Sequence, residues 1–175
     1  MLALNSPRWQ ELEIRSGSAS AVPSEIAYLL EHPSDGERLT DLSSELCSED
    51  TAWSAAYAAV PYLLEIACKQ PLEARGYALV SIGLIVMCSG DSLVPEDLKP
   101  AYRDSISSAL PLLLETMHLP VSGEDLRYQF LSVAALKGHL ALAELMNVLD
   151  ADVSCPECNQ SLGDVFEAMG IARDG

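Results

Sequence analysis

The chain has 175 residues, about the length of one domain, with 49% hydrophobic and 21% charged residues, an ordinary globular composition that excludes a disordered chain. Its 26 acidic residues against 10 lysines and arginines give a formal net charge of −16. Nucleic acids and anionic membranes are bound through clustered cations, so we expect neither as a partner. We expect a single domain over residues 1–175.

Neither an export signal nor a membrane span is recognisable in the sequence. The first ten residues, MLALNSPRWQ, lack a basic flank followed by an apolar core. The longest apolar run, Ala78 to Cys88, is shorter than the roughly 20 residues that cross a bilayer and is typical of a buried helix. We therefore expect a cytoplasmic protein, whose five cysteines are thiols or metal ligands rather than a disulfide framework.

Three segments share a branched apolar residue, a proline and further apolar residues at helical spacing, and a fourth has the same spacing without proline. Because positions i, i+3, i+4 and i+7 lie on one stripe, each segment predicts a helix with an apolar face. The segments are Val22-Pro23 with Ile26, Leu29 and Leu30; Val60-Pro61 with Leu63, Leu64 and Ala67; Leu110-Pro111 with Leu113, Leu114 and Met117; and Leu142, Leu145, Met146 and Leu149.

Proline is tolerated in the first turn of a helix, because its missing N–H would have no intrahelical partner there. Each proline therefore predicts the start of the second helix of a hairpin, with the preceding helix ending just before it. The first helices are then expected over residues 7–15, 37–59 with a break near Ser48, 72–89 and 124–137. The segment 90–108, which contains two prolines, is expected to add a short helix of its own.

Two helix starts and one helix face can be predicted in more detail. Ser34 with Glu37 and Ser122 with Asp125 have the spacing of capping boxes, in which side chains satisfy unpaired N–H groups. The helix over 124–137 is expected to bury one apolar face, made of Leu126, Phe130, Val133 and Ala134.

These helices form four predicted hairpins. A single hairpin cannot bury its apolar stripe, whereas stacked hairpins share one continuous core. The intervals between the segments bracket the roughly 34–47 residues of helix-pair repeats, and the segment 90–108 accounts for the widest one. The sequence thus predicts an all-α fold of stacked hairpins, with a compact helical bundle as the alternative.

The run from Trp53 to Ala67, WSAAYAAVPYLLEIA, resembles the central repeat of a group of uncharacterised bacterial HEAT-like helical-repeat proteins. Ser6-Pro7-Arg8-Trp9 and Cys155-Pro156-Glu157-Cys158 are similar to features of the same group, although Asn159 stands where glycine usually follows the knuckle. The resemblance spans most of the chain and rests on packing motifs. It implies a right-handed α-α superhelix, a HEAT/armadillo-like solenoid of about four helical hairpins, and no catalytic residue.

Motifs of catalysis are absent from the sequence. It has no Gly-rich phosphate loop, no nucleophile elbow and no paired-histidine zinc helix. The histidines His32, His118 and His139 stand singly at or near predicted helix ends, where the helix dipole or a turn accounts for them. We therefore expect a non-enzymatic protein without a cofactor.

Cys155 and Cys158 form a knuckle that can present two thiolates to one zinc ion. A structural zinc needs four ligands, and the chain has no second such pair. Four readings stay open: a zinc shared by two protomers of a homodimer, a zinc completed by histidine and cysteine from elsewhere, a redox dithiol, and a turn without metal. A zinc-dependent enzyme at this knuckle is the alternative function. Cys47, Cys68 and Cys88 are expected in helices as small hydrophobic residues.

Trp53 and Tyr57 stand one helical turn apart, and Tyr62 follows just beyond the expected turn. Solenoids bind partners through corresponding helices of successive repeats, and Trp and Tyr are common interface anchors. These three residues are therefore candidates for partner binding, and the alternative is that their rings fill the core. Between Lys137 and Arg173 the chain has six acids and no Lys or Arg, which suits a basic protein partner.

The predicted function is a protein–protein interaction module, such as a bacterial immunity or adaptor protein. A role in DNA repair is a third option, and it would need a basic groove that ten scattered cations hardly build. Residues 151–175 are expected to cap the last helix of the array, with a turn at 153–162 and a final helical turn at 163–169.

Overall fold

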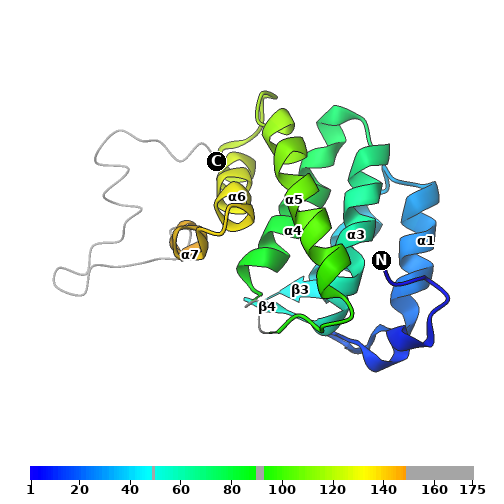
Figure 1. Ribbon diagram of the computed structural model, residues 1–175. Coiled ribbons are helices and arrows are strands. Elements are labelled where there is room, and N and C mark those ends of the chain that lie inside the picture. Colours follow the sequence, from blue (N-terminus) through cyan, green and yellow to red (C-terminus); the bar gives the residue numbers. More distant parts are fainter. Residues whose placement is uncertain (49, 90–92, 149–175) are drawn as a thin grey trace.

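The structure is a computed structural model that describes residues 1–48, 50–89 and 93–148 (Figure 1). Within these ranges seven α-helices make up most of the chain, together with two antiparallel strand pairs of two residues per strand. The all-α class predicted from the sequence is confirmed. No helix in these ranges combines the length and the apolar character needed to cross a membrane.

The elements follow one another in a simple order. The α-helices are α1 (Val22–Glu31), α2 (Gly36–Leu46), α3 (Ser54–Lys69), α4 (Arg75–Met87), α5 (Lys99–Thr116), α6 (Gly123–Leu136) and α7 (Leu140–Val148). Strand β1 (Glu13–Ile14) pairs with β2 (Gly17–Ser18), and β3 (Cys47–Ser48) pairs with β4 (Thr51–Ala52). Three short 3-10 helices are η1 (Pro7–Glu11), η2 (Ala19–Ala21) and η3 (Leu72–Ala74).

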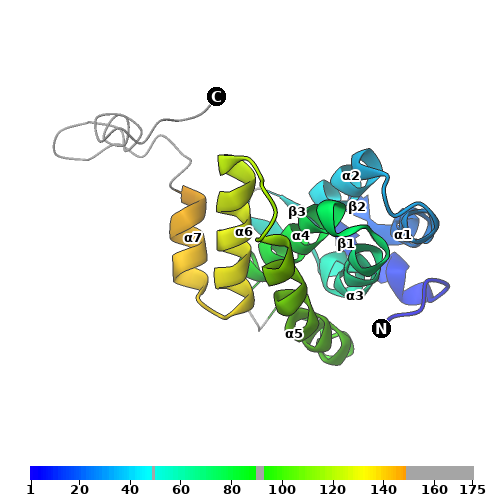
Figure 2. The ribbon, with the colours of Figure 1, turned by 90° about the horizontal axis from the view of Figure 1, so that it is seen from above.

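The first six α-helices pack in two rows. In one row α1 packs on α3 and α3 on α5, while in the other α2 contacts α4 and α4 packs on α6. Each helix also packs against its chain neighbour in the other row, so that α1–α2, α3–α4 and α5–α6 form pairs, and α7 lies on α6 at one end (Figure 2). The order of the helices across the molecule is therefore their order in the chain.

The apolar-proline repeat falls on the three helices of one row. Val22, Ile26 and Leu29 of α1 are buried, as are the corresponding apolar residues Val60, Leu63 and Ala67 of α3 and Leu113 of α5. The stripe that the repeat predicts is thus the core-facing side of α1 and α3, whereas on α5 the prediction is right for Leu113 and wrong for Leu114, which is 41% exposed.

The prediction that each proline begins a helix is right for Pro23 and wrong for the other two. Pro61 lies inside α3, which begins at Ser54, and Pro111 lies inside α5, which begins at Lys99. An internal proline costs about 3 kcal/mol, but the turn that precedes Pro61 is lined with fully buried alanines whose packing offsets this cost. The expected helix over 37–59 is accordingly two helices, α2 and α3, with the β3–β4 hairpin at the break near Ser48. The short helix expected within 90–108 is the first half of α5.

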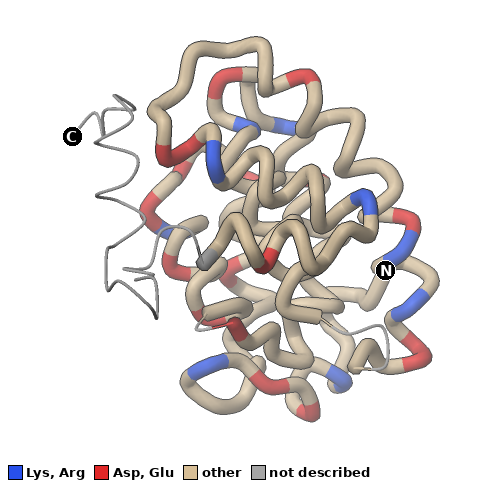
Figure 3. Tube along the Cα trace, turned by 90° about the vertical axis from the view of Figure 1, so that its left-hand side faces the viewer, with Lys and Arg blue, Asp and Glu red and all other residues tan. Residues whose placement is uncertain are grey.

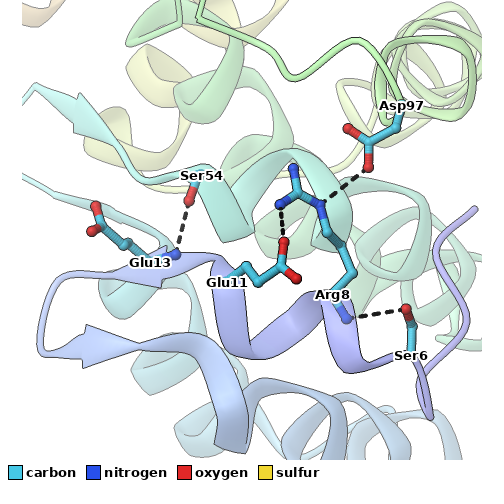
Figure 4. Close-up of polar contacts among 6 residues, drawn as sticks. All are labelled: Ser6, Arg8, Glu11, Glu13, Ser54 and Asp97. Carbon is cyan, nitrogen blue, oxygen red and sulfur yellow. Dashed lines mark hydrogen bonds and ion pairs between the residues drawn. The ribbon is translucent and has the colours of Figure 1, made fainter.

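The helix expected over residues 7–15 is not formed. Ser6 accepts the Arg8 N–H and caps the short helix η1, after which the chain turns through the β1–β2 hairpin at Gly17, whose φ of 128° suits glycine. Arg8 bridges Glu11 and Asp97 at 2.7 and 3.2 Å, and the Glu13 N–H donates to Ser54 Oγ at 2.8 Å (Figure 4). These contacts fasten the N-terminal segment to α3 and to the segment before α5.

One of the two predicted capping boxes is present. Ser122 Oγ accepts the Asp125 N–H at 3.0 Å and donates to the Asp125 carboxylate at 2.7 Å, as expected at the start of α6. At the start of α2 the cap is Asp35 rather than Ser34, because Asp35 Oδ1 accepts the Arg38 N–H. Both residue types cap helices, and the chain path after His32 brings Asp35 into position.

The core has one large and one small cluster. The large cluster is built mainly by α1 to α5, with Trp9 and Leu12 of the N-terminal segment and Leu136 of α6. The small cluster joins α4, α6 and α7 through Met87, Leu131, Ala134, Ala135 and Ala143. The apolar face predicted for α6 is wrong in part, because Leu126 and Phe130 are 37% and 46% exposed. α6 instead buries Gln129, Leu131 and Ser132, since small and polar side chains let it lie close to α4.

Candidate partner-binding cleft

The three aromatic residues predicted to bind a partner lie in or beside the core. Tyr57 and Tyr62 are 2% and 6% exposed, and Trp53 is the half-buried residue that precedes α3. The Tyr57 ring packs edge-on against Tyr102, with 5.5 Å between ring centroids. Two buried tyrosines offer no surface to a partner. The rings of Tyr57 and Tyr62 instead fill the core, which is the alternative that the sequence left open.

The two buried hydroxyls differ in their hydrogen bonds. Tyr62 Oη donates to the Leu2 carbonyl at 2.5 Å, whereas Tyr57 Oη makes no hydrogen bond of regular geometry among the described residues and has Ser89 as its polar neighbour. Burial raises the pKa of Tyr57 and the pKa of Tyr62, because the phenolate form is the one that loses its hydration.

The knuckle cysteines Cys155 and Cys158, and the whole predicted cap over 151–175, lie outside the described residues. Within the ranges that the structure covers, no three His, Cys, Asp or Glu side chains are gathered where they could hold a metal ion. Cys47 and Cys88 are not in the interior of helices as expected: Cys47 begins β3, and Cys88 ends α4.

A cleft of about 700 Å³ lies between α4, the end of α5 and the start of α6. Its volume is within the roughly 300–1,000 Å³ of typical ligand sites. Four aliphatic side chains line it, and seven polar ones accompany them: Val80, Leu84, Leu119 and Val121; and Glu73, Tyr77, Thr116, Glu124, Asp125, Tyr128 and Gln129.

Gln129 is, with Thr116, one of two buried polar residues among the described residues that line this cleft. Its side chain comes from α6 and lies against Gly76 of α4, and the residue is 4% exposed. The amide carbonyl Oε1 has no hydrogen-bond partner among the described residues. A buried acceptor left in this way costs about 1–3 kcal/mol, so a hydrogen-bond donor supplied by a ligand would be favourable.

Three carboxylates, those of Glu73, Glu124 and Asp125, line the same cleft, and no lysine or arginine does so among its described lining residues. Glu124 and Asp125 stand in the first turn of α6, where the helix dipole stabilises negative charge, and the Ser122 cap holds the Asp125 side chain. Acidic positions outnumber basic ones over the trace as a whole (Figure 3). The cleft therefore has an acidic rim on an acidic molecule.

Tyrosines flank the rim. Tyr77 of α4 is 44% exposed, and Tyr128 of α6 is half-buried with the Arg127 guanidinium 4.4 Å from its ring centre. No histidine, cysteine or lysine is among the described lining residues, so the cleft offers acceptors and apolar surface rather than a nucleophile with a base. Such an arrangement can bind a donor-rich, positively charged group.

Comparison of the chain with protein-family models, with curated proteins and with solved structures finds no match. The cleft was not predicted from the sequence either, where Asp125 was expected only as part of a capping box. The one sequence signal is Gln129, a large polar residue beside the apolar residues of its helix. That signal identifies a buried polar group but not the helix that it meets.

Proposed function

We propose that the protein is a non-enzymatic protein-binding module that takes a basic side chain of its partner into the cleft between α4 and α6. The observation that carries this proposal is a cleft whose described lining residues include three carboxylates, no lysine or arginine, and Gln129 with its buried, unpaired Oε1. A lysine or arginine side chain would supply the missing donor.

The cleft suits both the apolar stem and the charged head of such a side chain. Lysine and arginine have an apolar stem and a charged head, and the stem would lie against Val80, Leu84 and Leu119 while the head meets the acidic rim. Charge-assisted hydrogen bonds from the head group are about twice as strong as neutral ones. The net charge of −16 would also attract a basic partner over a distance and raise the association rate.

The two rows of helices support the finer description of the fold. Helix pairs that stack in chain order are the arrangement of a solenoid, and we propose the right-handed superhelix that the HEAT-like resemblance implies. An adaptor or immunity protein that neutralises a basic toxin in the cytoplasm is the biological role that fits this chemistry.

The test is a binding measurement by titration calorimetry on the full chain. The probe is a blocked peptide with one arginine between leucines, and its control is the same peptide with glutamine in place of arginine. We expect Gln129→Leu and Glu124→Gln each to weaken binding of the arginine peptide by about tenfold, which corresponds to about 1.4 kcal/mol.

Glu37→Gln is the matched control variant. Glu37 stands in the first turn of α2, as Glu124 does in the first turn of α6, so each variant removes one negative charge from a helix start. If Glu37→Gln weakens binding as much as Glu124→Gln, the peptide is attracted only by net charge and the cleft is not the site.

The alternative function, zinc at Cys155 and Cys158, is tested by metal analysis. A content well under one zinc per two chains would exclude both its enzymatic and its shared-zinc form.

A further inference from the structure

Nucleophilic and acidic side chains gather where the β3–β4 hairpin meets the C-terminal end of α4. Both strands pack against α4, and α7 lies against the same helix (Figure 1). Cys47 begins β3, and Cys88 ends α4 with its N–H donated to the Leu84 carbonyl at 3.0 Å. The hairpin therefore brings together two thiols that are far apart in the sequence.

The two thiols touch. Cys47 and Cys88 are both half-buried, and their side chains are hydrogen-bonded to each other. The position of Cys47 is fixed by the hairpin turn, where Asp50 has a φ of 59° and accepts a hydrogen bond from Asn147 Nδ2 of α7 at 3.1 Å. The hairpin that contains Cys47 is thus tied to α7 through Asp50.

A cavity of about 470 Å³ opens beside Cys88. Asp50, Ser89, Glu144 and Asn147 are among the residues that line it. Small neutral molecules can therefore reach the Cys88 sulfur, while the carboxylates of Asp50 and Glu144 repel anions from the same cavity.

We propose that Cys47 and Cys88 are a site of reversible oxidation that forms an intramolecular disulfide when the protein meets hydrogen peroxide. The hydrogen bond donated by Cys47 lowers the pKa of Cys88, and the same bond together with burial raises the pKa of Cys47. Cys88 lines the cavity, and Cys47 is not among its described lining residues, so Cys88 is the thiolate that attacks peroxide and Cys47 the thiol that resolves it.

The chemistry balances in two steps. The Cys88 thiolate attacks one peroxide oxygen and the O–O bond breaks, which leaves Cys88 as a sulfenic acid and releases hydroxide that takes a proton to become water. The Cys47 sulfur then attacks the Cys88 sulfur, the S–O bond breaks, and the Cys47 proton leaves with the hydroxide as a second water. A dithiol reverses the process by thiol–disulfide exchange and is itself oxidised to a disulfide.

The test treats the full chain with hydrogen peroxide, blocks the remaining thiols by alkylation and maps the cysteine peptides by mass spectrometry. We expect a peptide that links Cys47 to Cys88, which dithiothreitol removes. The oxidised chain should also melt about 5 °C or more above the reduced one, because the cross-link closes a long loop of the unfolded chain.

Cys68 is the internal control, since it is an exposed thiol on α3. In Cys47→Ser we expect Cys88 to stop at the sulfenic acid, which dimedone traps, and in Cys88→Ser we expect Cys47 to remain a thiol. The proposal is overturned if Cys68 is oxidised while Cys47 and Cys88 stay open to alkylation. It is also overturned if the only linked peptides found contain Cys155 or Cys158.

Discussion

Gly83 of α4 and Ser132 of α6 lie directly against each other where the two helices cross. A Cβ added at residue 83 would overlap the Ser132 side chain and come within 2.6 Å of its Cα. Ser132 Oγ in turn donates to the Val80 carbonyl of α4 at 3.3 Å. Because α4 and α6 also form two walls of the cleft, this contact sets the distance across it.

Gly83→Ala is expected to lower the free energy of unfolding by up to about 2 kcal/mol. Overpacking against Ser132 costs about 1–3 kcal/mol, and the higher helix propensity of alanine returns about 1 kcal/mol. Urea denaturation followed by circular dichroism measures the change. Gly36→Ala is the control, because a Cβ there meets open space, and equal stability of the two variants would contradict the close contact.

The two buried tyrosines should respond differently to loss of the hydroxyl. Tyr62→Phe removes the hydrogen bond to the Leu2 carbonyl and is expected to cost about 1 kcal/mol of unfolding free energy. Tyr57→Phe removes a hydroxyl that makes no hydrogen bond of regular geometry among the described residues and should cost less than Tyr62→Phe. Denaturant midpoints of the two variants at neutral pH check the contrast, and the reverse order would refute it.

Alkaline pH should destabilise the protein through the same two side chains. Burial raises the pKa of Tyr57 and Tyr62 above the unfolded value of about 10, so the folded state holds these protons more tightly than the unfolded state. Their contribution is fully present below the unfolded pKa and is lost as the pH rises through the folded pKa values. The free energy of unfolding, measured from pH 8 to pH 11, should fall at the alkaline end, and fall less in a Tyr57→Phe/Tyr62→Phe double variant. An equal fall in both chains would show that other groups cause it.

Deletion of residues 151–175 is expected to make the protein associate. Leu142 and Leu145 of α7 are 50% and 55% exposed, and the deleted segment follows α7 directly in the chain. Without that segment these leucines would present an open apolar face. Size-exclusion chromatography checks the result, and Leu142→Gln with Leu145→Gln in the shortened chain should restore a monomer. A shortened chain that elutes as one species of monomer size without these substitutions would rule out the capping role.

Sequence periodicity predicts much of the fold and little of the cleft. The buried stripes of α1 and α3 were predictable because each follows from the periodicity of a single helix. The start of α3 was not, because the buried alanines before Pro61 gain their stability from neighbouring helices, which a local rule for proline cannot include. The prediction of a helix over residues 7–15 was wrong for a similar reason, because the β1–β2 hairpin formed there depends on a contact with Ser54.

Neither the cleft nor the Cys47–Cys88 pair can be predicted from local sequence patterns. Glu73 of η3 and Gln129 of α6 line the same cleft only because α4, which follows η3, packs on α6. Cys47 meets Cys88 only because a two-residue strand turns back against the end of α4. Composition predicted the chemistry that a partner should have, because the excess of acid is a property of the whole chain. It could not predict where the acceptors converge.

The division of the core into a large and a small cluster has a consequence for local unfolding. α7 is held through a few side chains of the small cluster, whereas α3 belongs to the large one, so we expect α7 to open while the rest of the molecule stays folded. Its amide protons should then exchange with solvent sooner than those of α3. Because α7 carries Glu144 and Asn147, each opening would remove one wall of the cavity beside Cys88 and release the Asp50 turn. Local unfolding of α7 would thereby increase the time for which the Cys88 thiol is fully exposed to solvent.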